Sequence, residues 1–224
     1  MIEKHILPAD IERTSMAIIS RELEERGIAL PAENAAVIQR VIHATADFDY
    51  VENLVFTEHA VERGVAALSQ GVPILTDTNM ALAGISKPAR SRLHVEAACY
   101  MADADIAAAA KEQGTTRAVA SVKKGALLHP EAAFAVGNAP TALLALCELI
   151  EAGLRPSLVI GVPVGFVNVV DSKEQIFAVC EKNKIPAIVA LGRKGGSTVA
   201  AAICNALLYA ATDMVNPTNR GWQG

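Results

Sequence analysis

Residues 158–197 read LVIGVPVGFVNVVDSKEQIFAVCEKNKIPAIVALGRKGGS, and this stretch decides the fold. Two apolar runs, at 158–162 and 187–191, have the length and the β-branched content of buried strands. A helix is expected to begin at 171–172 between them, and another at Ser197 after the second run. A strand, a helix and a strand in this order predict two parallel neighbours, because parallel strands need a long crossover connection.

Helical stretches alternate with short apolar runs along the rest of the chain as well. Further strands are predicted at 54–57, 73–76, 95–99 and 117–120. Further helices are predicted to start at 8–10, 31–33, 57–58, 103 and 138–141. The alternation predicts one domain over residues 1–224, a three-layer α/β/α fold with a mainly parallel sheet that is doubly wound like that of flavodoxin. Ligands bind beyond the carboxyl ends of the strands in such folds, so the loops there are the candidate binding segments.

Composition favours this class and argues against several functions. Of the 224 residues, 52% are hydrophobic and only 4% aromatic, so aliphatic side chains must fill a large core. A formal net charge of −4 and the scarcity of aromatic rings argue against nucleic acid as a partner. An anionic ligand must therefore meet a locally basic pocket on this acidic chain.

The cysteines, the chain ends and the histidines indicate the compartment and argue against a membrane span and a metal site. Four dispersed cysteines in apolar segments indicate reduced core thiols in a cytoplasmic protein: Cys99, Cys147, Cys180 and Cys204. The first residues lack the pattern of a signal peptide, and polar residues interrupt the longest apolar helices, so no membrane span is expected. The polar residues 216–224 are expected to form a surface arm or a frayed tail. No metal site is expected, because the histidines form no ligand pair at helical spacing: His5, His43, His59, His94 and His129.

His43 lies in Arg40-Val-Ile-His-Ala-Thr-Ala-Asp47, an apolar helical stretch with a cation before the imidazole and an anion after it. At helical spacing, Arg40, His43 and Asp47 are expected on one face. Asp47 would favour the imidazolium, whereas Arg40 and burial would oppose it, which leaves a group poised to give and take a proton near neutral pH. The alternative is a histidine that only packs against the core.

The segment 192–197 follows the last predicted strand and reads Gly-Arg-Lys-Gly-Gly-Ser. The cations Arg193 and Lys194 precede a helix start there. The backbone amides of Gly195, Gly196 and Ser197 converge on the same spot, which predicts an anion site. The spacing matches neither a phosphate-binding nor a dinucleotide-binding loop. A tight turn with two solvated cations is the alternative.

Three further loops at predicted strand ends combine helix caps, glycines and polar side chains. They contribute six candidate contacts: Thr78, Asn79, Asn138, Thr141, Gly165 and Ser172. Helix capping alone explains Thr78 and the segment 137–141 equally well. Two glycines and a proline at 161–165 indicate a backbone that approaches another group closely.

In their order and spacing these segments resemble the precorrin-8X methylmutase family, over nearly the whole chain. Each motif is weak alone, but their joint order is specific. The matching motifs are Arg40-Val-Ile-His43 with Asp47, Gly71-Val-Pro-Ile-Leu-Thr-Asp77 with Met80 and Gly84, Gly114-Thr-Thr-Arg117, Gly137-Asn-Ala-Pro-Thr-Ala-Leu143, Pro163-Val-Gly-Phe-Val167 with Ser172-Lys-Glu174, and Gly192-Arg-Lys-Gly-Gly-Ser197 followed by Asn205-Ala-Leu207.

The resemblance implies an isomerase of cobalamin biosynthesis that moves a methyl group from C11 to C12 of precorrin-8X or cobalt-precorrin-8, giving hydrogenobyrinate or cobyrinate. It implies no cofactor, because the methyl group never leaves the macrocycle. By the same resemblance, His43 is the proton donor and acceptor, and Ser15 and Arg40 contact the substrate. A homodimer with pockets near the interface is also implied. The metal-free and the cobalt-containing substrates carry the same carboxylates around the ring, so these residues do not show which of the two the protein uses.

A corrinoid of this kind carries many carboxylates, which need cationic or amide partners. Arg40 and Arg117 are therefore the leading clamps, and Arg193 with the amides that follow it is expected to hold a further carboxylate. Taken alone, Arg117 fits an exposed arginine at a strand start equally well. Two other functions remain open at this level: a phosphate or nucleotide enzyme that uses the 192–197 loop, and a noncatalytic corrinoid carrier.

Overall fold

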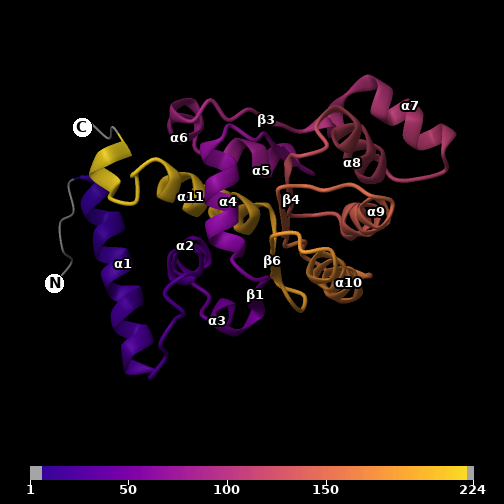
Figure 1. The fold of residues 1–224 in the computed structure, drawn as a ribbon. Helices are drawn as coiled ribbons and strands as arrows, with labels where there is room; N and C mark the ends of the chain where they lie inside the picture. The colour runs from indigo at the N-terminus through magenta and orange to yellow at the C-terminus, as the bar shows by residue number, and fades with distance from the viewer. Residues whose placement is uncertain (1–6, 221–224) are drawn as a thin grey trace.

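The computed structural model describes residues 7–220 and contains a six-stranded sheet between helices (Figure 1). Across the sheet the strand order is β1-β6-β5-β4-β2-β3. All neighbours are parallel except β1, which pairs antiparallel with β6. The strands are β1 (Leu54–Phe56), β2 (Ile74–Thr76), β3 (Ala97–Ala98), β4 (Ala133–Val136), β5 (Leu158–Gly161) and β6 (Ala187–Ala190).

The five parallel strands run in the order β3-β2-β4-β5-β6, which is the doubly wound flavodoxin order with an antiparallel strand added at one edge. The predicted fold class is therefore confirmed. From β2 the chain passes outward to β3 and then returns to β4 on the other side of β2, so the switch point lies between β2 and β4. This fold places ligands at the carboxyl ends of the strands on either side of that point.

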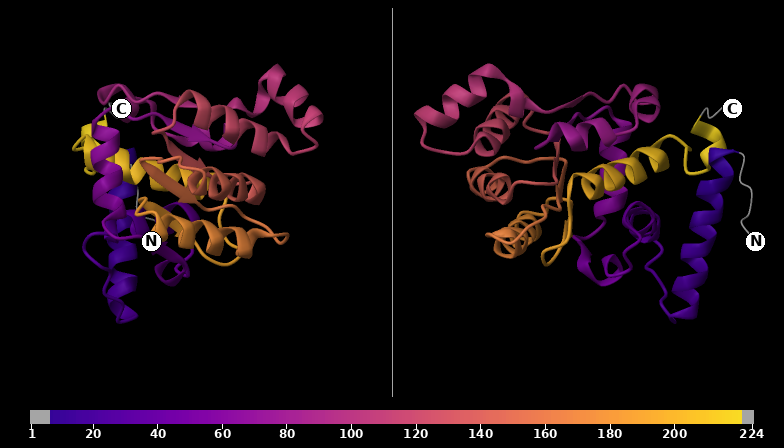
Figure 2. Two further views of the ribbon diagram at one scale, coloured as in Figure 1. Left: turned by 45° about the vertical axis from the view of Figure 1, so that its right-hand side comes forward. Right: turned by 180° about the vertical axis from the view of Figure 1, so that it is seen from behind.

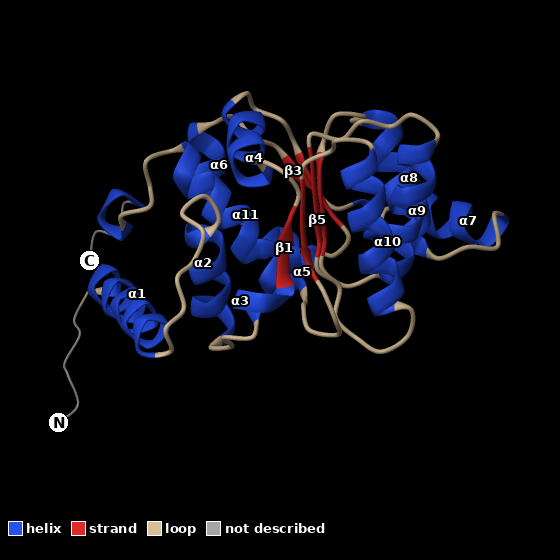
Figure 3. Cartoon of the chain, turned by 60° about the horizontal axis from the view of Figure 1, so that its bottom comes forward, coloured by secondary structure: helices blue, strands red, loops and turns tan. Residues whose placement is uncertain are grey.

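Helices cover both faces of the sheet (Figure 3). Buried aliphatic residues on each face form two main cores, so three layers result. On one face lie α2 (Ala35–Thr45), α4 (Ala60–Ser69), α5 (Asn79–Gly84), α6 (Lys87–Arg92) and α11 (Ser197–Ala211). On the other lie α7 (Ala104–Glu112), α8 (Arg117–Leu128), α9 (Pro140–Glu151) and α10 (Val169–Lys182). Short helical turns lie between or after these elements: α3 (Tyr50–Asn53), η1 (Tyr100–Ala102) and η2 (Pro217–Arg220).

Helix α11 is the central helix of its layer. Its residues Ala200, Ile203 and Leu207 are completely buried, and it packs against α2, α4 and α5. Small residues permit this close packing, because a Cβ on Gly84 would lie 2.8 Å from the Cβ of Ala201. The contact with α11 fixes α2, and with it His43, over one face of the sheet.

Helix α1 (Pro8–Glu25) lies outside these three layers, beyond α2 (Figure 2). Its residues Ile19 and Leu23 are buried against the rest of the protein, whereas its residues Ile11 and Ile18 are exposed. The helix packs mainly against α2 and η2. It is therefore attached along one side, and the structure has cavities where it meets α2.

The predicted strand at 117–120 is wrong, because Arg117 begins α8. Thr116 caps that helix, since its hydroxyl accepts a hydrogen bond from the amide of Val119 at 3.2 Å. The fourth strand is the next apolar run, β4, whose four residues are all buried. It reads Ala-Phe-Ala-Val, and alanine is depleted in strands, so the run carries a weak strand signal.

The other five predicted strands are confirmed, although β3 has only two residues. Helix starts at 8, 103 and 197 agree with the structure within a residue, whereas α4 begins at Ala60, later than expected, and α10 begins earlier, at Val169. In the expected surface arm or frayed tail, residues 217–220 form η2 and are therefore not frayed. His5 and residues 221–224 lie outside the described residues. Within residues 7–220, none of the helices combines the length and the apolar character that crossing a bilayer requires.

Asp77 follows β2 directly and joins it to the loop after β4, across the switch point. Its carboxylate accepts hydrogen bonds from the amides of Gly137, Asn138 and Ala139 at 2.8, 2.8 and 2.7 Å, and the residue is 3% exposed. These amides precede α9, so one carboxylate satisfies donors at that helix start. Asp77 therefore fixes the edge of the sheet at which ligands are expected.

Replacing Asp77 with asparagine should lower the free energy of unfolding by about 2–4 kcal/mol, because an amide NH₂ would face backbone donors that need acceptors. Urea unfolding followed by circular dichroism measures the change. Glu174→Gln, at an exposed position in α10, is the control and should change the value by less than about 0.5 kcal/mol. An equally small change for Asp77→Asn would contradict the assigned role.

Candidate functional site

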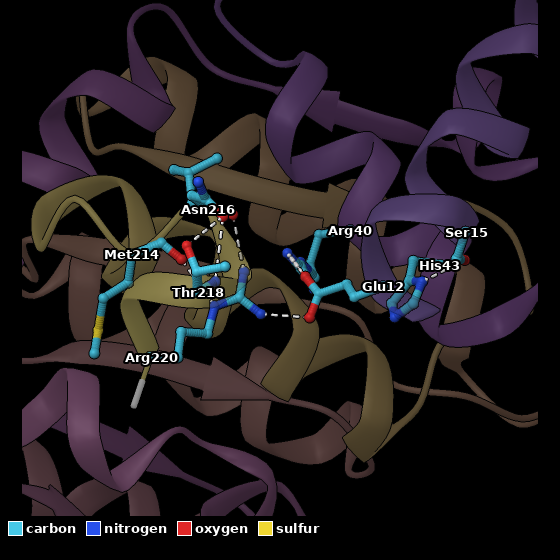
Figure 4. Close-up of polar contacts among 9 residues, drawn as sticks. Glu12, Ser15, Arg40, His43, Met214, Asn216, Thr218 and Arg220 are labelled. Carbon is cyan, nitrogen blue, oxygen red and sulfur yellow. Dashed lines mark hydrogen bonds and ion pairs between the residues drawn. The ribbon is translucent and has the colours of Figure 1, made fainter. Parts of the chain in front are cut away.

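His43 lies on α2, two residues before the helix ends, and faces Ser15 on α1 (Figure 4). Its Nδ1 and the hydroxyl oxygen of Ser15 are 2.8 Å apart. The ring is half-buried, and its Nε2 has no hydrogen-bond partner in the described part of the chain. A cavity of about 570 Å³ is lined by Ser15 and His43, together with apolar residues that include Ile18 and Phe48. The imidazole therefore opens onto a space between the two helices.

The expected pairing of His43 with Asp47 is wrong. Helix α2 ends at Thr45, and Ala46 adopts a left-handed backbone conformation with a φ of 54°. Asp47 instead forms an ion pair with Lys194 at 2.6 Å. The spacing argument failed because the helix stops before it reaches the aspartate.

Glu12 on α1 lies beside His43, and Arg220 in η2 contacts Glu12 from the other side (Figure 4). Sequence reasoning singled out neither of them. One oxygen of the Glu12 carboxylate lies 2.7 Å from the guanidinium of Arg40, and the other lies 2.5 Å from that of Arg220. The side chains are 16% exposed for Glu12, 13% for Arg40 and 6% for Arg220. This network connects α1, α2 and the C-terminal turn next to the imidazole.

These charges set the protonation equilibrium of His43. Burial and the Arg40 guanidinium lower the pKa of His43 below its usual range, Glu12 opposes them, and Arg220 lowers it further. Burial works against ionisation of Glu12, but the hydrogen bond from Arg220 and the ion pair with Arg40 outweigh it and hold the pKa of that carboxyl below its ordinary value. Near neutral pH the imidazole is therefore mainly neutral, and an anion placed beside it would favour its protonation.

Arg40, one of the two leading carboxylate clamps, is already paired with Glu12. Its guanidinium also lies over the ring of Tyr209, 5.3 Å from the centroid. The side chain lines a second cavity, of about 400 Å³, together with Gln39, Tyr209 and Val215. A substrate carboxylate at Arg40 would share the guanidinium with Glu12.

A second group of predicted residues gathers at the carboxyl edge of the sheet. Thr78 caps α5, and its hydroxyl oxygen lies 2.8 Å from that of Ser197. The amide of Gly196 donates to the carbonyl oxygen of Val162 at 2.8 Å. A Cβ on Gly195 would lie 2.2 Å from that same oxygen, so only glycine fits there. The loop after β6 is thus folded tightly against the loop after β5.

Lys173 holds the loop after β6 from within the protein. The residue is completely buried, and its ammonium donates to the carbonyl oxygens of Gly192 at 2.9 Å and Lys194 at 2.7 Å. Burial lowers the pKa of Lys173 to about 8. Because two bonds from one ammonium span three residues of the loop, Lys173 fixes its conformation.

Lys194 is not the free cation that the loop sequence predicts. Its ammonium lies 2.6 Å from a carboxylate oxygen of Asp47 and 2.6 Å from one of Asp49. These hydrogen bonds raise the pKa of Lys194 above its usual value. The contact joins the segment after α2 to the loop after β6, so the region around His43 and the carboxyl edge of the sheet are neighbours.

Other predicted contacts are spread along this edge. Arg117 is exposed at the start of α8. The Thr141 hydroxyl at the start of α9 lies 3.1 Å from the hydroxyl of Thr116. Asn79 and Asn138 are exposed beside the starts of α5 and α9. These side chains occupy the edge where ligands are expected, in positions that also suit helix caps.

The loop after β5 contains one correction. Ser172 is completely buried, and its hydroxyl donates to the carbonyl oxygen of Val169 at 3.0 Å, so it faces the first turn of α10 rather than the strand ends. Gly165 has a φ of 140°, which suits glycine, and its amide donates to the carbonyl oxygen of Arg193 at 3.2 Å. The guanidinium of Arg193 lies over the exposed ring of Phe166, 5.4 Å from the centroid.

One of the missed residues had a usable signal. Glu12 precedes Ser15 by three residues on a helix, a spacing that places both side chains on one face. Lys173 stands inside the matching motif at 172–174, but nothing local marks it as buried. Arg220 contacts a residue 208 positions away, which no local pattern predicts.

Comparisons with known proteins identify the family of this chain and agree with its fold. The precorrin-8X methylmutase family matches residues 10–210. The chain is 41% identical over 208 residues to the cobalt-precorrin-8 methylmutase of Leptospira interrogans, covering 90% of this chain and 93% of the relative. It is 44% identical to that of Salmonella typhimurium, covering 90% and 95%. The solved precorrin-8X methylmutase of Thermus thermophilus has a TM-score of 0.81 at 38% identity, covering 91% of this chain and 98% of that one.

The chain combines a doubly wound α/β fold with a half-buried histidine that lines a cavity between α1 and α2. The comparisons make this class specific, because relatives of high identity span almost the whole chain. The chain belongs to the precorrin-8X methylmutase family, whose members are isomerases of cobalamin biosynthesis, and the family predicted from the motifs is confirmed.

Lys173→Met should loosen the loop after β6, because two hydrogen bonds from one charged donor are lost. Hydrogen exchange of the amides at 192–197 is expected to accelerate about tenfold or more. Lys182→Met is the control, since Lys182 is an exposed lysine of α10 that pairs with Glu151 at 3.0 Å. Equal exchange in the wild type and Lys173→Met would show that the ammonium does not hold the loop.

Proposed function

We propose that this chain moves a methyl group from C11 to C12 of precorrin-8X or cobalt-precorrin-8, giving hydrogenobyrinate or cobyrinate. The observation that carries the proposal is His43, whose Nδ1 contacts Ser15 at 2.8 Å while the ring lines a cavity of about 570 Å³. Relatives named for each substrate supply the substrate class, and the residues described do not separate the two.

His43 carries the proton that the migration needs. The imidazolium protonates the conjugated macrocycle, which makes the migration terminus electron-poor. The methyl group then moves with its bonding electron pair, and the neutral imidazole takes a proton back to restore the conjugation. The proton returns to the imidazole and the bonding electrons stay within the substrate, so no cofactor is consumed. The carboxylates of the bound substrate raise the pKa of His43 in the complex, against the effect of Arg40.

Carboxylates on the rim of the substrate need donors from both parts of the site. Arg40, Arg117 and Arg193 each offer a planar fork that can bind a carboxylate through two hydrogen bonds. The Lys194 contact with Asp47 supports one continuous site, since it brings the sheet edge next to α2. The remaining proposed contacts along that edge are Thr78, Asn79, Asn138, Thr141, Gly165, Gly195, Gly196 and Ser197.

We further propose that the protein is a single domain, that it is cytoplasmic and that it forms a homodimer. A macrocycle roughly 15 Å across exceeds the usual small-ligand pocket and is easier to enclose between subunits. The exposed Ile11 and Ile18, which line the cavity beside His43, support closure by a second copy. Four free cysteines suit a reducing compartment.

Light scattering at micromolar concentration should give twice the monomer mass of 23.5 kDa. The expectation follows from the apolar wall of the cavity, which a second subunit would cover. A fully active monomer would contradict pockets near an interface.

His43→Ala should reduce turnover at least about a hundredfold, because the general acid and base is lost. Visible absorbance during incubation with precorrin-8X or its cobalt form measures conversion, since moving the methyl group changes the conjugation. The Kd for the corrinoid should change little. Ser15→Ala, which keeps the imidazole, should retain a measurable part of the rate.

Unaltered turnover in His43→Ala would remove His43 from the mechanism. A noncatalytic carrier would bind the corrinoid without a spectral change even in the wild-type protein. Stabilisation by nucleotides but not by corrinoids in a thermal shift would favour the nucleotide alternative.

A further inference from the structure

The C-terminal residues 214–220 return to helix α1, and Arg220 fixes them there (Figure 4). Its guanidinium binds the Glu12 carboxylate at 2.5 Å and donates to the carbonyl oxygens of Met214 at 2.8 Å and Val215 at 3.0 Å. The same group lies over the ring of Tyr209, 3.8 Å from the centroid. With its donors used on several sides, Arg220 holds Glu12 in one place.

Glu12 connects this anchor to the proposed proton carrier. It precedes Ser15 by one turn of α1, just as Arg40 precedes His43 by one turn of α2. Two contacts therefore join these faces of the helices: Glu12 with Arg40 at 2.7 Å, and Ser15 with the imidazole at 2.8 Å. Because α1 packs mainly against α2 and η2, its position depends on the Arg220 anchor.

We propose that Arg220 is a positioning residue of the methylmutase, which acts through Glu12 to hold α1 and Ser15 against His43. The inference rests on the proposed role of His43 in proton transfer. A guanidinium suits this task because its planar fork binds the carboxylate and two backbone carbonyls in fixed directions, which an ammonium does less well.

Charged groups face the imidazole from each neighbouring element: Glu12 from α1, Arg40 from α2 and Arg220 from η2. Glu22 and Arg26 line the same cavity and pair with each other at 3.3 Å. Loss of the Arg220 charge should raise the pKa of the imidazole, whereas loss of the Glu12 charge should lower it. These shifts report the charges around the imidazole, whereas a fall in kcat with a smaller change in KM reports the position of α1 and Ser15 against it.

Arg220→Met removes the charge and the fork while keeping an unbranched side chain. The His43 ring is titrated by NMR in the protein without substrate, and its signal is assigned by its loss in His43→Ala. Its pKa should rise by about half a unit. The basic limb of the kcat/KM profile should move up by the same amount, because the reaction starts from the imidazolium. In this variant kcat should fall about tenfold, with a smaller change in KM.

Three further variants make the test specific. Glu12→Gln should move the titration of His43 in the opposite direction, by about half a unit. Arg220→Lys should restore the titration and recover part of kcat. Arg92→Met is the matched control, because the exposed Arg92 donates to the carbonyl oxygen of Asn219 at 3.0 Å and so contacts the same segment; it should leave both quantities unchanged.

An unchanged His43 titration in folded Arg220→Met would overturn the inference, as would an equal shift in Arg92→Met. If Arg220→Met does not fold, Glu12→Gln decides by the same readout, and an unchanged titration there would overturn the inference. The titration is measured without substrate, so its result does not depend on the proposed reaction. A wild-type protein that converts no corrinoid would overturn the proposed function and leave this result in place.

Discussion

One carboxylate, that of Glu12, joins the beginning, the body and the end of the chain. It lies between the guanidinium groups of Arg40 and Arg220, which belong to elements that no short connection brings together. Burial lowers the pKa of His43, and two cations against one anion leave a positive balance beside the ring that acts in the same direction. An anionic substrate would reverse that balance. In the proposed mechanism, the histidine would then donate a proton most readily when the macrocycle is present.

The second constraint is the parallel sheet, which brings loops from distant parts of the sequence to one edge. Asp77 closes the switch point by accepting three backbone hydrogen bonds, and Lys173 fixes the loop after β6 from inside. Lys194 then ties that loop to the end of α2 through Asp47. A ligand that reached from His43 to the sheet edge would meet donors held in place by buried charges, rather than by flexible surface side chains.

Sequence reasoning succeeded where the physical signal is local. Apolar runs predicted five of the strands, whereas β4, in which only Val136 is β-branched, was missed. The role of His43 as a proton carrier stays a prediction. The partners of charged residues were predicted poorly. Asp47 was assigned to His43 by helical spacing, but the helix ends first and Lys194 is its partner. Arg220 lies 208 residues from Glu12, so only the folded chain reveals their contact.

The central claim is that the His43 imidazole touches the tetrapyrrole edge where the methyl group migrates. A crystal structure of the protein with the corrinoid product bound tests it most directly. The account predicts the macrocycle in the cavity between α1 and α2, with His43 Nε2 within about 4 Å of the ring carbons next to the migrated methyl group. A macrocycle bound elsewhere, with the imidazole out of reach of its edge, would contradict the account.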